Sequence, residues 1–340
     1  MRILLTQLRR IGDVLMTTPS VRAVRKAFPG ARIVFLTESP AQELFRYNSR
    51  VDEVWTFPLH GSWRARLALL RRLRAERFDL ALDFFSNPAS AILTRLSGAR
   101  RRVGFAFRGR ALAYSDAVPL PAGRQYAALD KAALLAPLGL ALDSPLPELP
   151  FGEPERAYAA QQLHALGVRE GAPLVALCPV SRQPYKVWPA ERYAALADRL
   201  IERHGARILF IWGPGEEHFV RAVRAAMAGR ALPDYPVPQL LQLAALLERC
   251  TLFVGNDGGP RHFAIAVGTP TVGIFGRPYP ENWTPPGARL HRTLAHDPGC
   301  KSACTFPACS HLNCINGIAY EAVRDTTEAL LAEIRHARLD

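Results

Sequence analysis

Residues 252–262 read Leu-Phe-Val-Gly-Asn-Asp-Gly-Gly-Pro-Arg-His, a short apolar run followed by a glycine pair and a proline. The run predicts a strand over Leu252–Val254, and the proline predicts a helix over about 260–267. A second segment with this design lies near the start, where Ile3–Thr6 precedes Arg-Ile-Gly-Asp-Val-Leu-Met-Thr-Thr-Pro at 10–19. Each half of the chain therefore has a strand–loop–helix edge of the kind that binds ligands in α/β proteins.

The first half alternates apolar runs with helical patterns, which predicts a parallel sheet covered on both faces. Strands are expected at Ile3–Thr6, Ile33–Leu36, Glu53–Phe57, Leu80–Phe84 and Arg102–Phe105. Helices are expected at about 20–28, 40–47, 63–76 and 88–97.

The second half repeats this scheme after a proline-rich stretch at 142–150, which is the best linker candidate. Its further strands are expected at Leu174–Cys178, Arg207–Trp212 and Thr271–Phe275, and its further helices at about 154–167, 189–204, 216–228, 239–247 and 319–337. We therefore predict two Rossmann-like α/β domains, 1–150 and 151–340, that face each other across a cleft. The last helix could pack back on the first domain.

The amino-acid composition indicates which kinds of binding partner to expect. The net charge is +13, yet only four of the 43 Lys and Arg residues are lysines. Such a charge favours anionic partners, but the arginines are scattered and no zinc-finger or RNA-recognition motif occurs, so nucleic acid is not expected. No apolar run reaches the roughly 18 residues of a membrane span, and the start lacks the pattern of a secretory signal. We expect a cytoplasmic protein.

The first edge offers one carboxylate. Gly12 permits a tight turn at the strand end, and Asp13 either caps the following helix or, if Thr18 is the cap, stands free on a loop. A free carboxylate at this position could act as a general base on a hydroxyl group.

The second edge offers an anion site. Asp257 is interpreted as a helix N-cap, and the amides of Gly258 and Gly259 lie at the start of a helix whose dipole favours negative charge. His262, in the first turn, is more often structural than catalytic when it stands alone.

Two further loops follow strands in this half. Ser181, Arg182 and Lys186 could all contact a phosphate, and Lys186 provides a compact charge for a diphosphate leaving group; a solvated loop lysine is the alternative. In the turn Trp-Gly-Pro-Gly-Glu-Glu at 212–217, a glutamate could accept hydrogen bonds from ribose hydroxyls. The alternative is a helix-start glutamate favoured by the dipole.

These four signals occur in a consistent order, and with them the chain resembles the ADP-heptose:lipopolysaccharide heptosyltransferases, glycosyltransferase family 9. The resemblance covers nearly the whole length. It is carried by IGDVLMTTPSVRAVRKAFPGARI at 11–33, KVWPAERYAALADRL at 186–200, IWGPGEE at 211–217 and NDGGPRHFAIAVGTPTVGIFG at 256–276.

The resemblance implies a GT-B fold and an inverting, metal-independent transfer of heptose from ADP-heptose, with no cofactor required. It implies that Asp13 is the base, that Lys186 contacts the donor phosphates together with Ser181 and Arg182, and that Glu217 binds the ribose. The turn Asp257–His262 would hold the diphosphate and sugar, and the first domain would bind the acceptor.

Two positions depart from the family pattern. Gly258 and Arg182 stand where hydroxyl residues are common, which puts the exact donor in doubt more than the reaction class. Arg261 adds a positive charge that could compensate for the missing hydroxyl.

Cys300, Cys304, Cys309 and Cys314 crowd into fifteen residues. They could bind zinc or an iron–sulfur cluster, with His311 as an alternative ligand, but the spacing lacks the Cys-x-x-Cys knuckle typical of structural zinc. Reduced thiols in a loop are the leading alternative, since stable disulfides are not expected in a reducing compartment.

The expected partners are a nucleotide-diphospho-sugar, ADP-heptose above others, and an anionic glycan such as the lipopolysaccharide core. The arginine-rich helix at 63–76 is expected to pack on its sheet through Trp63, Leu67, Leu70 and Leu73, and it could also rest on the cytoplasmic face of the inner membrane. A transferase or epimerase using another nucleotide sugar, and a non-catalytic nucleotide-sugar-binding protein, remain alternative functions.

Overall fold

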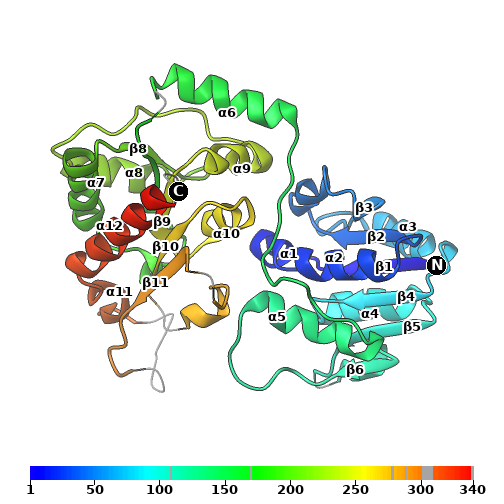
Figure 1. Ribbon diagram of the computed structural model, residues 1–340. Coiled ribbons are helices and arrows are strands. Elements are labelled where there is room, and N and C mark those ends of the chain that lie inside the picture. The colour runs from blue at the N-terminus through cyan, green and yellow to red at the C-terminus, as the bar shows by residue number, and fades with distance from the viewer. Residues whose placement is uncertain (108, 169–170, 277–278, 288, 301–308, 338–340) are drawn as a thin grey trace. The chain divides into compact units, whose positions relative to one another are not determined.

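The computed structural model describes residues 1–107, 109–168, 171–276, 279–287, 289–300 and 309–337. The chain divides into two compact units, Met1–Pro150 and Phe151–Asp340, each built on one sheet (Figure 1).

The sheet of the first unit is parallel throughout, with the strand order β3-β2-β1-β4-β5-β6. Its strands are β1 Arg2–Thr6, β2 Arg32–Thr37, β3 Glu53–Thr56, β4 Leu80–Asp83, β5 Arg101–Phe105 and β6 Asp116–Val118. Its helices are α1 Ile11–Leu15, α2 Thr18–Ala27, α3 Trp63–Ala75, α4 Pro88–Leu96 and α5 Ala127–Ala132, with 3₁₀ turns η1 Ala41–Phe45, η2 Ala111–Ala113 and η3 Ala133–Leu138.

The second unit also has a parallel sheet, with the order β11-β10-β9-β7-β8. Its strands are β7 Leu174–Cys178, β8 Arg207–Phe210, β9 Leu252–Asn256, β10 Thr271–Phe275 and β11 His291–Ala295. Its helices are α6 Glu153–Ala165, α7 Ala190–His204, α8 Glu217–Ala226, α9 Leu240–Glu248, α10 Gly259–Ala266, α11 Asn313–Asn316 and α12 Tyr320–His336, with η4 Pro184–Lys186 and η5 Pro280–Asn282.

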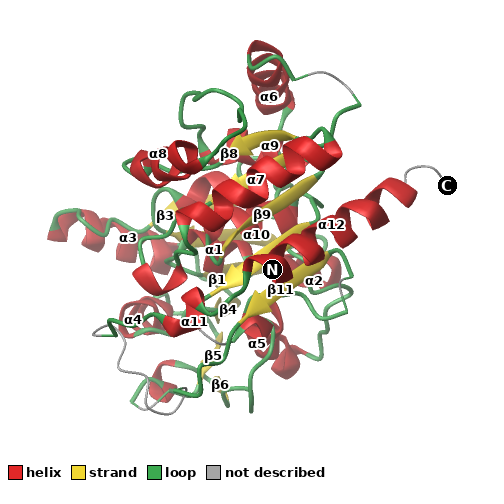
Figure 2. Cartoon of the chain, turned by 90° about the vertical axis from the view of Figure 1, so that its left-hand side faces the viewer, coloured by secondary structure: helices red, strands yellow, loops and turns green. Residues whose placement is uncertain are grey.

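Helices cover both faces of this second sheet. In Figures 1 and 2, α7 and α12 lie on one face, and α9 and α10 lie on the other. The α12 helix contacts β10, β11 and α7 of its own unit, while its expected packing on the first domain stays a prediction.

Several elements differ from the sequence predictions. The helix expected at 40–47 is the short 3₁₀ turn η1, and α1, α5 and the strands β6 and β11 were not predicted. Both missed strands lie at a sheet edge, where one side lacks a neighbour and an apolar run is not required.

The predicted apolar face of α3 is also partly wrong. Leu73 is fully buried and Leu69 nearly so in the core beside Leu4 and Trp55, whereas the Trp63 side chain is 69% exposed. Trp63 is the first residue of the helix, and its ring lies 5.6 Å from the Arg64 guanidinium carbon. The helix therefore packs through its later turns only.

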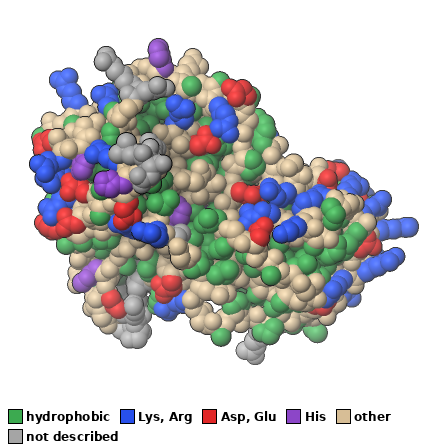
Figure 3. Space-filling model, viewed as in Figure 1, with side chains coloured by type: hydrophobic (Ala, Val, Ile, Leu, Met, Phe, Trp, Pro, Cys, Tyr) green, Lys and Arg blue, Asp and Glu red, His purple; other side chains and the backbone are tan. Residues whose placement is uncertain are grey.

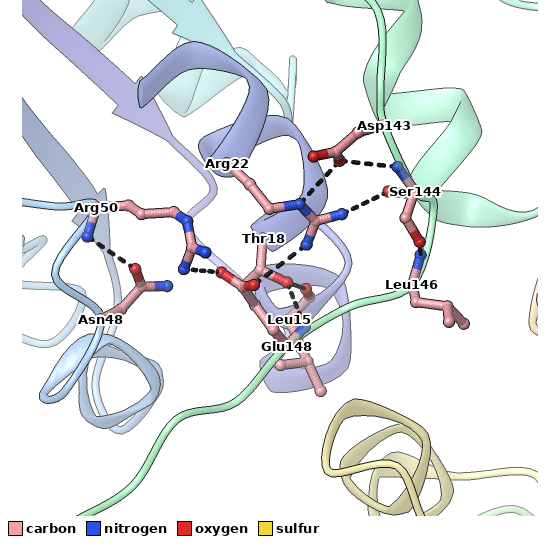
Figure 4. Close-up of polar contacts among 9 residues, drawn as sticks. All are labelled: Leu15, Thr18, Arg22, Asn48, Arg50, Asp143, Ser144, Leu146 and Glu148. Carbon is pink, nitrogen blue, oxygen red and sulfur yellow. Dashed lines mark hydrogen bonds and ion pairs between the residues drawn. The ribbon is translucent and has the colours of Figure 1, made fainter. Parts of the chain in front are cut away.

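The proline-rich segment before Pro150 is fixed to the first unit by charged groups (Figure 4). Arg22 of α2 donates from Nε to Asp143 Oδ1 at 2.9 Å, from Nη1 to Glu148 Oε2 at 3.2 Å and from Nη2 to the Ser144 carbonyl at 2.7 Å. Arg50 donates to the other Glu148 oxygen at 2.5 Å. The segment is thus part of the first unit up to Glu148.

We expect Arg22→Met to lower the free energy of unfolding by about 1–3 kcal/mol, because it removes charge-assisted hydrogen bonds and leaves Glu148 with one cation fewer. Denaturant unfolding followed by circular dichroism measures this. The matched control is Arg203→Met on the exposed face of α7, which we expect to change stability by less than about 0.5 kcal/mol. Equal stability of the two variants would contradict the fixing role.

Candidate functional site

The turn between β9 and α10 is built differently from the prediction. The N-cap residue of α10 is Gly258, whose backbone is extended, and no side chain caps the helix. Asp257 is therefore not the N-cap, and that interpretation was wrong. Its carboxylate instead accepts a hydrogen bond from Lys186, with Nζ to Oδ2 at 2.5 Å.

This ion pair is largely shielded from solvent. The Lys186 side chain is 25% exposed and the Asp257 side chain 9%. Lys186 is the last residue of η4, on the loop that follows β7. The pair therefore joins two loops at the carboxyl edge of the sheet and holds the Lys186 ammonium beside the glycine turn.

Asn256, which sequence reasoning missed, connects the same two loops. Its Oδ1 accepts from the Trp188 amide at 3.2 Å and the Tyr193 hydroxyl at 2.8 Å, and its Nδ2 donates to the Pro179 carbonyl at 2.8 Å. Asn256 is buried, so these bonds satisfy its amide within the protein. The signal in the sequence that could have identified Asn256 is an amide residue at the end of an apolar strand.

The glycine pair itself leaves room. A Cβ on Gly259 would meet nothing within 4 Å, and one on Gly258 would meet its nearest atom at 3.8 Å. Packing therefore does not require glycine at either position, and a ligand can approach this backbone. Gly276 is different, because its Cβ would overlap the Tyr185 carbonyl next to Lys186.

The two residues after Pro260, Arg261 and His262, are buried in α10. Arg261 is fully buried, and its guanidinium donates to the Trp283 carbonyl at 2.8 Å and to Thr284 Oγ1 at 3.3 Å. Its guanidinium thus holds residues 283–284, and the expected compensation for the missing hydroxyl stays a prediction. His262 is 5% exposed, and its ring packs against Trp283 with centroids 5.4 Å apart.

A cavity of about 680 Å³ adjoins the loop that carries Lys186. Its lining residues are Ser181, Arg182, Pro184, Val187, Pro214, Gly215, Glu216, His218, Phe219 and Leu312. That volume is typical of a site for a small organic ligand. Polar groups from the β7 loop and the β8 turn line this cavity together with the aromatic residue Phe219.

Of the two glutamates in the β8 turn, Glu216 lines the cavity. Its Oε2 accepts from the Gly213 amide at 3.0 Å, and its Oε1 lies 3.5 Å from Arg182 Nε. Glu217 is the exposed first residue of α8, and its Oε1 is 3.4 Å from the Gly215 amide. Glu216, one residue before the predicted Glu217, is thus the glutamate on the cavity wall, and the ribose contact expected of Glu217 stays a prediction.

Asp13 and Gly12 belong to the first unit. Both lie inside the short helix α1, so Gly12 takes part in a helical turn and Asp13 is the third helical residue. Asp13 neither caps α2, whose N-cap is Thr17, nor stands on a loop, and both alternatives were wrong. Its Oδ2 accepts from the Arg10 amide at 3.3 Å, and its side chain is half-buried.

Three of the four clustered cysteines, Cys300, Cys309 and Cys314, are half-buried free thiols, and Cys304 lies outside the described residues. Cys309 Sγ is 3.5 Å from His311 Nε2, and partial burial, with Cys309 nearby, raises the pKa of Cys314. Within the described ranges, no three His, Cys, Asp or Glu residues group closely enough to hold a metal ion. Metal binding by the cluster stays a prediction.

Basic side chains lie on the visible surface of both units, interspersed with acidic ones (Figure 3). Among the described helices, none is both long and apolar enough to cross a membrane.

Comparisons with known proteins agree with this architecture. The sequence model of glycosyltransferase family 9 (heptosyltransferase) matches residues 66–307. Lipopolysaccharide heptosyltransferase 3 of Escherichia coli is 26% identical over 290 residues, which cover 81% of this chain and 83% of that protein.

Two solved structures are similar over nearly the full length. The family 9 glycosyltransferase of Veillonella parvula has a TM-score of 0.84 and 26% identity, with 98% of this chain and 97% of that chain covered. The ADP-heptose lipopolysaccharide heptosyltransferase II of E. coli has a TM-score of 0.79 and 23% identity, with 98% and 99% covered. These likenesses confirm the predicted GT-B fold class and the resemblance drawn from the motifs. The chain belongs to glycosyltransferase family 9, the heptosyltransferases.

Proposed function

We propose that this glycosyltransferase moves a heptose from ADP-heptose to a hydroxyl group of a lipopolysaccharide-core or related anionic glycan, with inversion at the anomeric carbon. The observation that carries the proposal is the Lys186–Asp257 pair beside the open glycine turn and the 680 Å³ cavity. The similar E. coli heptosyltransferase II bears ADP-heptose in its name, which supports this donor.

The second unit would bind the donor. Lys186 and the amides at the start of α10 offer positive charge to the diphosphate, and Ser181 and Arg182 lie on the cavity wall within the same loop. Glu216 is our candidate for the ribose hydroxyls, with Glu217 as the family-based alternative. In the free protein Asp257 neutralises Lys186, so diphosphate binding would exchange part of that pairing for phosphate contacts.

The first unit would bind the acceptor and supply the base. Asp13 takes the proton of the acceptor hydroxyl as its oxygen attacks the anomeric carbon. The bond from that carbon to the phosphate oxygen breaks, and ADP leaves with the electron pair, stabilised by Lys186 and the helix start. This route uses no metal, and the cysteine cluster takes no part in it.

The cellular location of the reaction follows from the nature of the acceptor. A lipid-linked glycan is presented at a membrane, so we propose that the protein works in the cytoplasm at the inner membrane surface. The exposed Trp63 and the arginines of α3 are the candidate contact.

Donor binding tests the first part of the proposal. We expect ADP to bind more tightly than UDP or GDP in calorimetry, and Lys186→Met to weaken ADP binding by about 10- to 100-fold, the loss expected for a charge-assisted contact. Lys26→Met, which removes an exposed lysine of α2, is the matched control and should bind ADP normally. Preference for UDP or GDP would assign another nucleotide sugar, and no nucleotide binding would favour a non-catalytic protein.

Asp13→Asn tests the base. We expect transfer to fall by about 10²- to 10⁴-fold, because the amide cannot accept the proton, while ADP affinity stays unchanged. Product analysis with ADP-heptose and a heptose-deficient core acceptor measures transfer, and the anomeric configuration of the product tests inversion. A folded Asp13→Asn protein with full activity would refute this role, and donor turnover without acceptor would indicate an epimerase or hydrolase.

A further inference from the structure

Lys131 of α5 is a buried cation that the proposed reaction does not use. It is 8% exposed, and its Nζ donates to Gln7 Oε1 at 2.8 Å. Burying an ammonium group is unfavourable unless anionic or polar partners surround it. The groups around Lys131 must therefore offset the cost of burying its charge.

Those neighbours lead to Asp13 through one chain of hydrogen bonds. Gln7, the residue after β1, is also buried, and its Nε2 donates to the Arg9 carbonyl at 2.6 Å. The next amide, that of Arg10, donates to Asp13 Oδ2. Lys131 thus anchors the short segment that leads from β1 into α1 and that holds the Asp13 carboxylate.

The charged groups around Lys131 also connect it with Asp13. Burial lowers its pKa, and the negative charges of Asp13, Asp130 and Asp83 oppose this, with Asp13 first among them. Asp130 is its neighbour on α5, and its own pKa is raised by burial. Asp83, at the end of β4, is fully buried and accepts from the Tyr114 hydroxyl at 2.8 Å, and burial raises its pKa too. Asp13 and Asp130 are both half-exposed, whereas Asp83 is fully buried.

The choice of lysine at position 131 also indicates a specific role for this side chain. Only four of the 43 Lys and Arg residues are lysines, so lysine at this buried position stands out against a strong preference for arginine. An ammonium group is a compact point charge on a flexible stem, whereas a guanidinium is a planar fork that needs several acceptors. The single acceptor that Gln7 Oε1 offers at 2.8 Å suits the former.

We propose that Lys131 is a positioning residue for Asp13: through Gln7 it fixes the Arg9–Arg10 segment, whose Arg10 amide holds the Asp13 carboxylate. This inference rests on the proposed function, which names Asp13 as the base.

Lys131→Met is the test, because methionine retains the volume and removes the charge. We expect kcat to fall by about 10-fold or more while the KM for the donor stays unchanged, because the Asp13 carboxylate loses the fixed position from which it takes the proton. Binding of ADP should match the wild type. An active wild type together with a folded Lys131→Met enzyme of unchanged kcat would overturn the proposal.

A double-mutant cycle with Asp13→Asn provides a readout that does not depend on activity. We expect Lys131→Met to destabilise the protein less in the Asp13→Asn background than in the wild type, and additive effects would count against the link. Absence of transfer by the wild type would refute the proposed function instead, and the cycle alone would then decide the Lys131–Asp13 link. If Lys131→Met does not fold, Gln7→Met serves: it keeps the ammonium and removes its partner, so a wild-type kcat in that variant would overturn the anchoring role.

Discussion

The pairing of β7 with β9 is the constraint on which the candidate site depends. The two strands are parallel and in register, with Cys178 opposite Gly255, so the loop after β7 and the turn after β9 leave the sheet at the same edge. A Cβ on Gly255 would lie 2.7 Å from the Cys178 Cβ, and glycine is therefore needed for this close approach. Once the strands are paired in this way, Lys186 and Asp257 meet, although 71 residues separate them.

Two lysines near the carboxyl edges of the two sheets, Lys186 and Lys131, differ in exposure. Lys186 is partly open to solvent and sits beside a cavity, so a ligand can compete for it. Lys131 is enclosed and bound to a neutral amide, so it acts through the protein. The chain uses arginine for the bonds that fix structure, as at Arg22 and Arg261, where several acceptors match the planar fork.

Sequence patterns predicted the central elements because burial on both faces leaves a strong apolar signal. The strands Leu174–Cys178 and Thr271–Phe275 have the predicted bounds and are buried along their length. Sequence patterns failed where a structure depends on contacts between residues far apart in the sequence. No local pattern distinguishes β11, which pairs with β10 at the edge of the sheet. No local pattern shows that Asp257 bonds Lys186 and not its own helix. Lys131 was missed because its significance lies in Gln7 and Asp13, more than a hundred residues earlier.

Gly258 stands where the family commonly has a hydroxyl residue, and the structure shows which explanations of this difference are possible. A hydroxyl side chain would fit there, since the nearest atom to a Cβ is 3.8 Å away, so steric exclusion does not explain the glycine. What remains at the turn is the backbone amides at the start of α10 and the Lys186 ammonium, and both act on negative charge without regard to hydroxyl geometry. Under the proposed function, the loss of one hydroxyl would remove a directional contact and preserve the electrostatic attraction, which is the component that a departing diphosphate needs most.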